Sequence, residues 1–90
     1  MRTFKVDSPE YYLFRIEGDE KVYKIPLMAS MNNREAKAFE DTNGDYMLQV
    51  EWLRTYIGDV IDEMTVDMTS DIIREWASAS RDQGADLGES

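Results

Sequence analysis

The chain contains neither cysteine nor histidine among its 90 residues. The absence of cysteine excludes disulfides, thiolate nucleophiles and thiolate metal sites, and it is typical of proteins in a reducing compartment. The absence of histidine removes the commonest general base near neutral pH and the commonest metal ligand. Carboxylate-pair chemistry stays open in principle, but no carboxylate pair stands out from the others. The sequence therefore indicates a protein that is not an enzyme and that carries no cofactor and no metal ion.

Long apolar runs are also missing from the sequence. No run approaches the roughly 20 apolar residues that cross a bilayer, and residues 1–5 contain no hydrophobic signal segment. We therefore expect a protein that stays in the cytoplasm where it is made. We expect no contact with a membrane.

Basic residues are scarce, with 10 lysines and arginines against 19 acidic residues and a net charge of −9. The excess lies in the second half of the chain, because residues 46–90 carry −7 and residues 1–45 carry −2. Such a surface repels nucleic-acid phosphate and anionic lipid. The composition thus argues against nucleic-acid binding and favours basic or amphipathic protein partners, while self-association stays open.

A length of 90 residues allows one small domain with a thin core. We expect a single compact domain over residues 1–80. Residues 81–90 are small, polar and rich in glycine, a composition that favours a flexible C-terminal tail, disordered in the free protein.

Two short segments near the N-terminus alternate apolar and polar side chains, the pattern of half-buried strands. Residues 11–17 and 21–25 flank a Gly-Asp turn, which predicts a β-hairpin, and Pro26 ends the second strand. An isolated hairpin is barely stable in water, so helices must cover its apolar face. The side chains expected to face inward are Tyr12, Phe14, Ile16 and Val22, with Tyr23 or Ile25 beside them.

The remaining sequence predicts three to four helices. Asn32 or Asn33 begins a short helix that runs to about Asp41, and Asp45 begins the strongest one, which ends near Gly58. Residues 60–64 can add one more turn. Thr69 or Ser70 begins a last helix that continues to about residue 80. The fold class is therefore α+β, an N-terminal β-hairpin packed on three to four α-helices.

Two stretches invite comparison with cation sites. Residues 41–45 begin like a calcium-binding EF-hand loop, but such a loop needs glycine at its sixth position and an acid at its twelfth, where this chain has Tyr46 and Trp52. We interpret the stretch as a helix-capping turn. A second acidic group lies between the two main helices, and we interpret it as a solvated connection, with contact to a basic partner as the alternative. Its members are Asp59, Asp62, Glu63 and Asp67.

The apolar stripes of the two main helices supply the candidates for partner binding. Trp52 and Trp76 lie on these stripes, and core packing is the commoner role of such residues. The alternative is that part of the stripe forms an exposed groove, since exposed aromatic and Met-rich patches often bind proteins. The candidate partner-binding residues are Trp52, Tyr56, Met64, Met68 and Trp76.

The order of these features resembles that of the tail assembly chaperones of long-tailed bacteriophages. The N-terminal strand pair ends in a proline, with FRIE at residues 14–17 and YKIP at residues 23–26. A central amphipathic helix carries Leu53. The last helix contains IREWASAS at residues 73–80, and the chain finishes in Gly-Glu-Ser. The resemblance covers about residues 10–90 and includes no catalytic signature.

This resemblance implies a non-enzymatic role in phage tail assembly. Members of the family bind the tape measure protein, a very long helical chain, and are thought to cover its apolar stretches until tail tube subunits assemble around it. We therefore expect a chaperone that binds and solubilises such a protein. Two other functions stay open. One is a structural head–tail or tail component, and the other is a small acidic inhibitor that mimics DNA.

Overall fold

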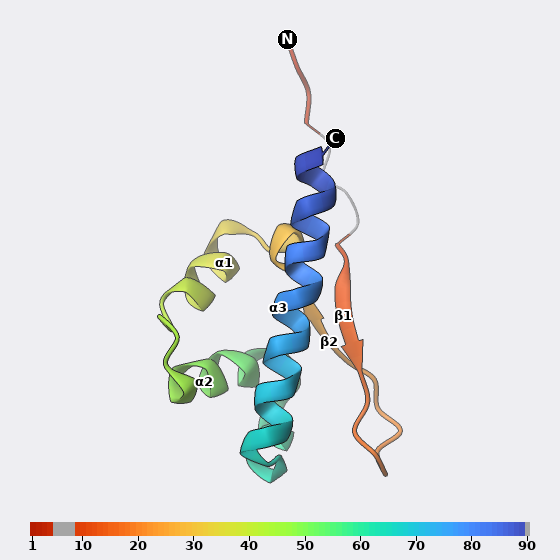
Figure 1. Ribbon diagram of the computed structural model, residues 1–90, viewed down its shortest axis with the longest axis vertical. Coiled ribbons are helices and arrows are strands. Elements are labelled where there is room, and N and C mark those ends of the chain that lie inside the picture. The colour runs from red at the N-terminus through yellow and green to blue at the C-terminus, as the bar shows by residue number, and fades with distance from the viewer. Residues whose placement is uncertain (5–8, 90) are drawn as a thin grey trace.

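The computed structural model describes residues 1–4 and 9–89, with side chains up to residue 82. An antiparallel hairpin is followed by three α-helices, and the predicted α+β fold is confirmed (Figure 1). In the view of Figure 1, α3 runs in front, with the hairpin to its right and α1 and α2 to its left, and α2 packs directly against β2 behind it. The elements are β1 (Tyr11–Phe14), β2 (Tyr23–Pro26), the 3-10 turn η1 (Met28–Ser30), α1 (Asn33–Glu40), α2 (Tyr46–Ile57), the 3-10 turn η2 (Gly58–Glu63) and α3 (Val66–Glu89).

The hairpin is shorter than predicted, and its register decides which side chains it buries. Phe14 lies opposite Tyr23, and their rings stack with centroids 5.4 Å apart. Because neighbouring residues of a strand point to opposite faces, this pairing places Tyr23 and Ile25 in the core and Val22 in solvent. The predicted inward orientation of Val22 is therefore wrong. Tyr12, Phe14 and Ile16 pack against the core as predicted.

The first two helices begin where the sequence predicts. The Asn32 side chain accepts a hydrogen bond from the Glu35 backbone N–H, and the Glu35 carboxylate accepts one from the Asn32 N–H, which completes a capping box. Asp45 caps α2 by accepting from the Leu48 N–H at 3.1 Å. Gly58, at a φ of 79°, ends α2. The predicted extra turn after it is η2.

Helix α3 begins at Val66, earlier than the predicted start at Thr69 or Ser70. The Thr65 hydroxyl accepts a hydrogen bond from the Met68 N–H at 3.1 Å, the geometry of an N-cap. The Thr69 hydroxyl instead donates to the Thr65 carbonyl inside the helix, and its side chain is buried. The backbone of α3 continues to Glu89, beyond the predicted end near residue 80. Ser90 lies outside the described residues, and the flexibility of residues 81–90 stays a prediction.

The core is centred on Trp76 of α3, which is 1% exposed. Its indole N–H donates to the Pro26 carbonyl at 2.8 Å and so fixes α3 to the end of β2. The ring centroids of Phe39 and Trp52 lie 4.8 and 4.9 Å from that of Trp76. One aromatic cluster thus joins α1, α2, α3 and the hairpin. The buried apolar residues are Tyr23, Ile25, Leu27, Trp52, Leu53, Ile57, Ile61, Ile72 and Trp76.

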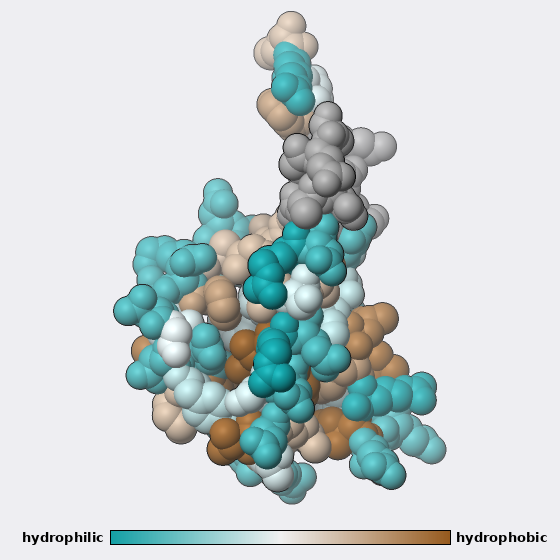
Figure 2. Space-filling model, in the orientation of Figure 1, coloured by the Kyte–Doolittle hydropathy of each residue, from teal (hydrophilic) through white to brown (hydrophobic). Residues whose placement is uncertain are grey.

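The outer surface is mostly hydrophilic along α3, with apolar residues exposed beside it at the hairpin (Figure 2). The side chains of Leu13 and Val22 contribute to this exposed apolar area. Within the described residues, none of the helices combines the length and the apolar character that crossing a bilayer requires.

Candidate functional site

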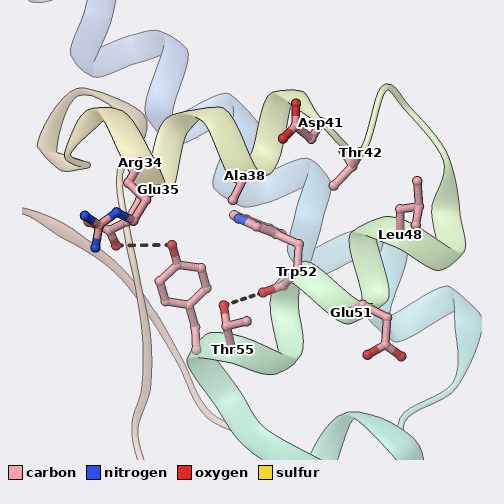
Figure 3. Close-up of a pocket in the computed structure, with 10 residues that line it drawn as sticks. Arg34, Glu35, Ala38, Asp41, Thr42, Leu48, Glu51, Trp52 and Thr55 are labelled. Atoms are coloured by element: carbon pink, nitrogen blue, oxygen red, sulfur yellow. Dashed lines mark hydrogen bonds between the residues drawn. The ribbon is translucent and has the colours of Figure 1, made fainter.

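An open groove runs between α1 and α2, with a volume of about 430 Å³ (Figure 3). It exists because α1 is short and contributes no fully buried residue, so it covers only part of the apolar stripe of α2. Figure 3 shows α1 across the top of the groove, with the α2 side chains projecting from below. The residues used in the argument below are Glu35, Ala38, Leu48, Glu51, Trp52 and Tyr56.

The apolar wall of the groove comes from three α2 residues spaced four apart, Leu48, Trp52 and Tyr56. Residues at this spacing share one helix face. Leu48 is 50% exposed, Tyr56 is half-buried and Trp52 is only 5% exposed. The stripe is therefore most exposed at Leu48, buried at Trp52 and half-buried at Tyr56. Leu48 thus extends the apolar wall of the groove to the molecular surface.

Tyr56 closes one end of the groove by joining the two helices. Its hydroxyl donates to the Glu35 carboxylate at 3.2 Å, the same carboxylate that completes the capping box of α1. Burial and the neighbouring Glu35 charge raise the pKa of Tyr56 to about 12. The phenol is therefore a neutral hydrogen-bond donor at physiological pH, and Glu35 holds both α1 and α2 in place.

The indole nitrogen of Trp52 is the exceptional polar atom of the site. Within the described part of the chain, it is the one buried side-chain nitrogen or oxygen that has no hydrogen-bond partner. Figure 3 shows the indole lying beneath Ala38 of α1. A buried N–H without an acceptor has lost its bond to water and gained nothing in return. The nitrogen is enclosed by protein atoms beside the Tyr56 hydroxyl and is not exposed on the groove surface.

Charges surround this apolar wall, and most of them are negative. Glu35, Asp41 and Glu51 lie around the groove against a single base, Arg34. Lys37 pairs with Asp41 at 2.9 Å, and both side chains are mainly exposed. Exposed pairs of this kind contribute little to stability. Asp41 can therefore exchange Lys37 for a basic residue of a partner at a small cost in free energy.

The structure distributes the five predicted partner-binding residues over several places. Trp52 and Tyr56 come together in the groove, although Trp52 contributes to it mainly from the core side. Trp76 is buried, so for its ring the core-packing interpretation holds. Met64 is half-buried against the core, and Met68 is 39% exposed on α3, away from α1. These five residues therefore do not lie on one surface, and their role in partner binding stays a prediction.

Sequence reasoning missed Leu48, Ala38 and Glu35 as members of the site. A signal for Leu48 was available, because it lies four residues before Trp52 on the stripe. No signal identified Ala38 or Glu35, since their role depends on how α1 crosses α2. That crossing is set by the contact of Phe39 with Trp52 and Trp76, a tertiary arrangement.

A second depression, of about 440 Å³, lies between the hairpin and the start of α3. Met68 lies at its edge, and the Tyr12 hydroxyl donates to the Glu75 carboxylate at 3.1 Å. Burial and the Glu75 carboxylate raise the pKa of Tyr12 to about 12. Its walls mix apolar side chains with the charged side chains of Arg15, Glu17, Asp71 and Glu75. It is therefore the weaker candidate for a docking surface.

The two acidic stretches have structural roles. Asp45 caps α2 and Asp41 pairs with Lys37, which supports the capping-turn interpretation of residues 41–45. Arg54 binds Asp62 at 2.7 Å and Asp59 at 3.1 Å, which ties α2 to η2 and lowers the pKa of Asp62. Across residues 1–4 and 9–82, no group of three acidic side chains is arranged to hold a metal ion.

Comparison of the chain with protein-family models, with curated proteins and with solved structures finds no match.

Proposed function

We propose that this protein is a non-enzymatic chaperone that binds an apolar helical segment of another protein in the groove between α1 and α2. The observation that carries the proposal is the stripe of Leu48, Trp52 and Tyr56, which lines the groove and is exposed at Leu48, half-buried at Tyr56 and buried at Trp52 between them. A groove of this form is suited to helix-in-groove recognition, in which one apolar face of a helix lies against an apolar wall.

The resemblance to phage tail assembly chaperones suggests the kind of partner. A tape measure protein is long and helical, and its apolar stripes would aggregate before the tail tube covers them. A bound protein with a net charge of −9 would keep such a complex in solution through repulsion between complexes. We therefore propose that the protein acts in the cytoplasm, that of the host cell if a phage encodes it, and that it solubilises a tape measure protein during tail assembly.

Co-expression tests this function directly. The chain would be produced together with the long helical protein encoded nearest to it, and the solubility and co-purification of that protein would be measured. We expect the partner to become soluble and to elute with the chain. If the partner stays insoluble and no complex forms, the tail-chaperone function is wrong.

A matched pair of variants locates the binding surface. Leu48 and Met47 are neighbours in the first turn of α2 and are 50% and 63% exposed, but only Leu48 lines the groove. Leu48→Glu should weaken partner binding at least tenfold, because burying a leucine contributes about 1.5–3 kcal/mol. Met47→Glu makes the same charge change next to it and should leave binding within about twofold of wild type. Equal effects of the two variants on partner binding would show that the partner does not bind in this groove.

A further inference from the structure

One edge of the hairpin has no neighbouring strand in the described part of the chain. The Leu27 N–H donates to the Glu10 carbonyl at 2.9 Å, so the Glu10 carbonyl faces the second strand. The backbone groups of successive residues in a strand point alternately to its two sides. By this alternation the N–H and C=O of Tyr11 and Leu13 point to the free edge of β1, where no described residue pairs with them.

The opposite edge of the hairpin, along β2, is closed. The Trp76 indole N–H donates to the Pro26 carbonyl at 2.8 Å, and this carbonyl points away from β1, as the same alternation requires. Pro26 has no N–H to offer, and α2 packs against β2. Proteins commonly protect an edge strand with proline or charged residues. The sequence of β1 is YYLF and contains neither.

Apolar side chains lie on both faces of β1. Tyr12 and Phe14 are half-buried on the inner face, where their rings stack with centroids 5.9 Å apart. Tyr11 and Leu13 are 38% and 60% exposed on the outer face. Side chains of paired residues share a face of the sheet, so a strand that joins this edge has to be apolar on both faces. A second copy of β1 meets this requirement.

The charge distribution favours the same occupant. The chain carries −9 in total, whereas β1 has no charged residue, so two copies can approach at this edge without opposing like charges within the strand. A pair with Leu13 opposite Leu13 of the second copy places Tyr12 opposite Phe14 of that copy and extends the aromatic stack. It also converts a two-stranded sheet, which is marginal in water, into a four-stranded one.

We infer that two copies of this chain pair through the free edges of β1, antiparallel about a twofold axis, and form one four-stranded sheet. In the view of Figure 1, β1 lies to the right of β2, whereas α1 and α2 lie to the left. The dimer therefore leaves the groove between α1 and α2 open in each copy. Two grooves on one particle increase the avidity for a long helical chain, a property that goes beyond the proposed function of one groove.

Sedimentation equilibrium of the full chain tests the pairing. A short edge strand gives a small interface and weak association, so the protein would be studied from about 10 µM to about 1 mM. The mass should rise from 10.5 kDa to twice this value and no further, because a twofold interface is closed. Salt should strengthen the dimer, since it screens the repulsion between two copies that each carry −9.

Amide hydrogen exchange locates the contact. The N–H groups of Tyr11 and Leu13 face solvent in the monomer and become bonded in the dimer, so their exchange should slow by about threefold or more at the highest protein concentration. The N–H of Tyr12 faces β2 in both states. Its exchange should change less than that of its two neighbours.

Variants at the edge keep the test independent of folding. Leu13→Pro removes an N–H that β2 does not use, and it should weaken dimerisation by about tenfold or more. Leu13→Lys places like charges opposite each other and should have the same effect. Val22 is 47% exposed and lies outside β1, so Val22→Lys makes the same charge change and should leave dimerisation within about twofold of wild type. Near-UV circular dichroism verifies that each variant is folded.

Four results would overturn the inference. They are a monomer over the whole concentration range, a mass beyond that of a dimer, a dimer that folded Leu13→Pro retains, and a dimer without slowed exchange at Tyr11 and Leu13. If the chain stays monomeric and a co-expressed partner slows these amides, the edge binds a strand of that partner and the second-copy inference is wrong. A monomeric chain that still solubilises its partner leaves the chaperone function standing.

Discussion

The two tryptophans are buried almost equally, yet only Trp76 has a partner for its indole N–H. Replacing either by phenylalanine removes similar apolar volume from one aromatic cluster. Trp76→Phe also leaves the buried Pro26 carbonyl without its donor, whereas Trp52→Phe removes a donor that had no acceptor. We therefore expect Trp76→Phe to lower the free energy of unfolding by about 1–3 kcal/mol more than Trp52→Phe, as measured by urea denaturation. A larger cost for Trp52→Phe would contradict the assigned hydrogen bonds.

Two tyrosines make stability depend on alkaline pH. Burial and a neighbouring carboxylate raise the pKa of both Tyr12 and Tyr56 from 10.0 to about 12. Below pH 10 each phenol is protonated in the folded and in the unfolded chain, so stability is unaffected. Between pH 10 and 12 the unfolded chain releases these protons while the folded chain retains them, and the free energy of unfolding falls.

This pH dependence can be assigned by removing the two hydroxyls. The double variant Tyr12→Phe, Tyr56→Phe should lose less stability than wild type between pH 10 and 12, although it is less stable at neutral pH because two hydrogen bonds are gone. Thermal unfolding across this range gives the comparison. Parallel curves for the two proteins would show that other groups cause the decline.

At the scale of elements, the start of α2 depends on Asp45. Its side chain accepts from the Leu48 N–H at 3.1 Å, so Asp45→Ala should lower the free energy of unfolding by about 1 kcal/mol. Asparagine caps helices about as well as aspartate, and Asp45→Asn should cost little. Added Ca²⁺ should change the melting temperature of neither wild type nor variant. A calcium-dependent stabilisation that Asp45→Asn removes would restore the metal interpretation of residues 41–45.

Local patterns were sufficient to predict most of the elements. Asn32 and Asp45 cap helices as their positions indicate, and alternation identified the hairpin. The inward face of the second strand could not be derived, because Val22 and Tyr23 are both apolar and only the pairing with Phe14 distinguishes them. The prediction of where α3 begins was wrong for a similar reason. Thr65 and Thr69 both suit an N-cap, and burial of Thr69 under tertiary contacts settles the choice.

The candidate site was harder to predict than the fold. The stripe of α2 identified Trp52 and Tyr56 from spacing alone, but the same spacing could not say where the core ends along it. The answer depends on α1, whose Phe39 covers Trp52 and whose short length leaves Leu48 open. The same limit applies to Trp76. Helical spacing places it on an apolar stripe, but it cannot distinguish a tryptophan at the centre of a core from one at its edge.

At the scale of the whole molecule, the net charge of −9 admits two kinds of binding, and the arrangement of charges favours one of them. A DNA mimic needs carboxylates that are free to replace phosphates. Here part of the most acidic stretch is already paired, since Arg54 draws Glu51, Asp59 and Asp62 around one guanidinium. The open apolar stripe at Leu48 has no role in a phosphate mimic but is expected of a helix binder.

The salt dependence of partner binding distinguishes the binding of an apolar helix from the binding of a protein that recognises mimicked phosphates. Burial of an apolar stripe is insensitive to ionic strength, whereas rim charges are screened at distances beyond about 8 Å at physiological salt. We therefore expect partner affinity to fall by no more than about tenfold when salt rises from ~50 to ~200 mM, as measured by calorimetry. A target bound through mimicked phosphates would lose roughly 10³-fold or more over that range. Such a steep loss, together with unchanged binding by Leu48→Glu, would shift the assignment from a helix chaperone to an acidic inhibitor.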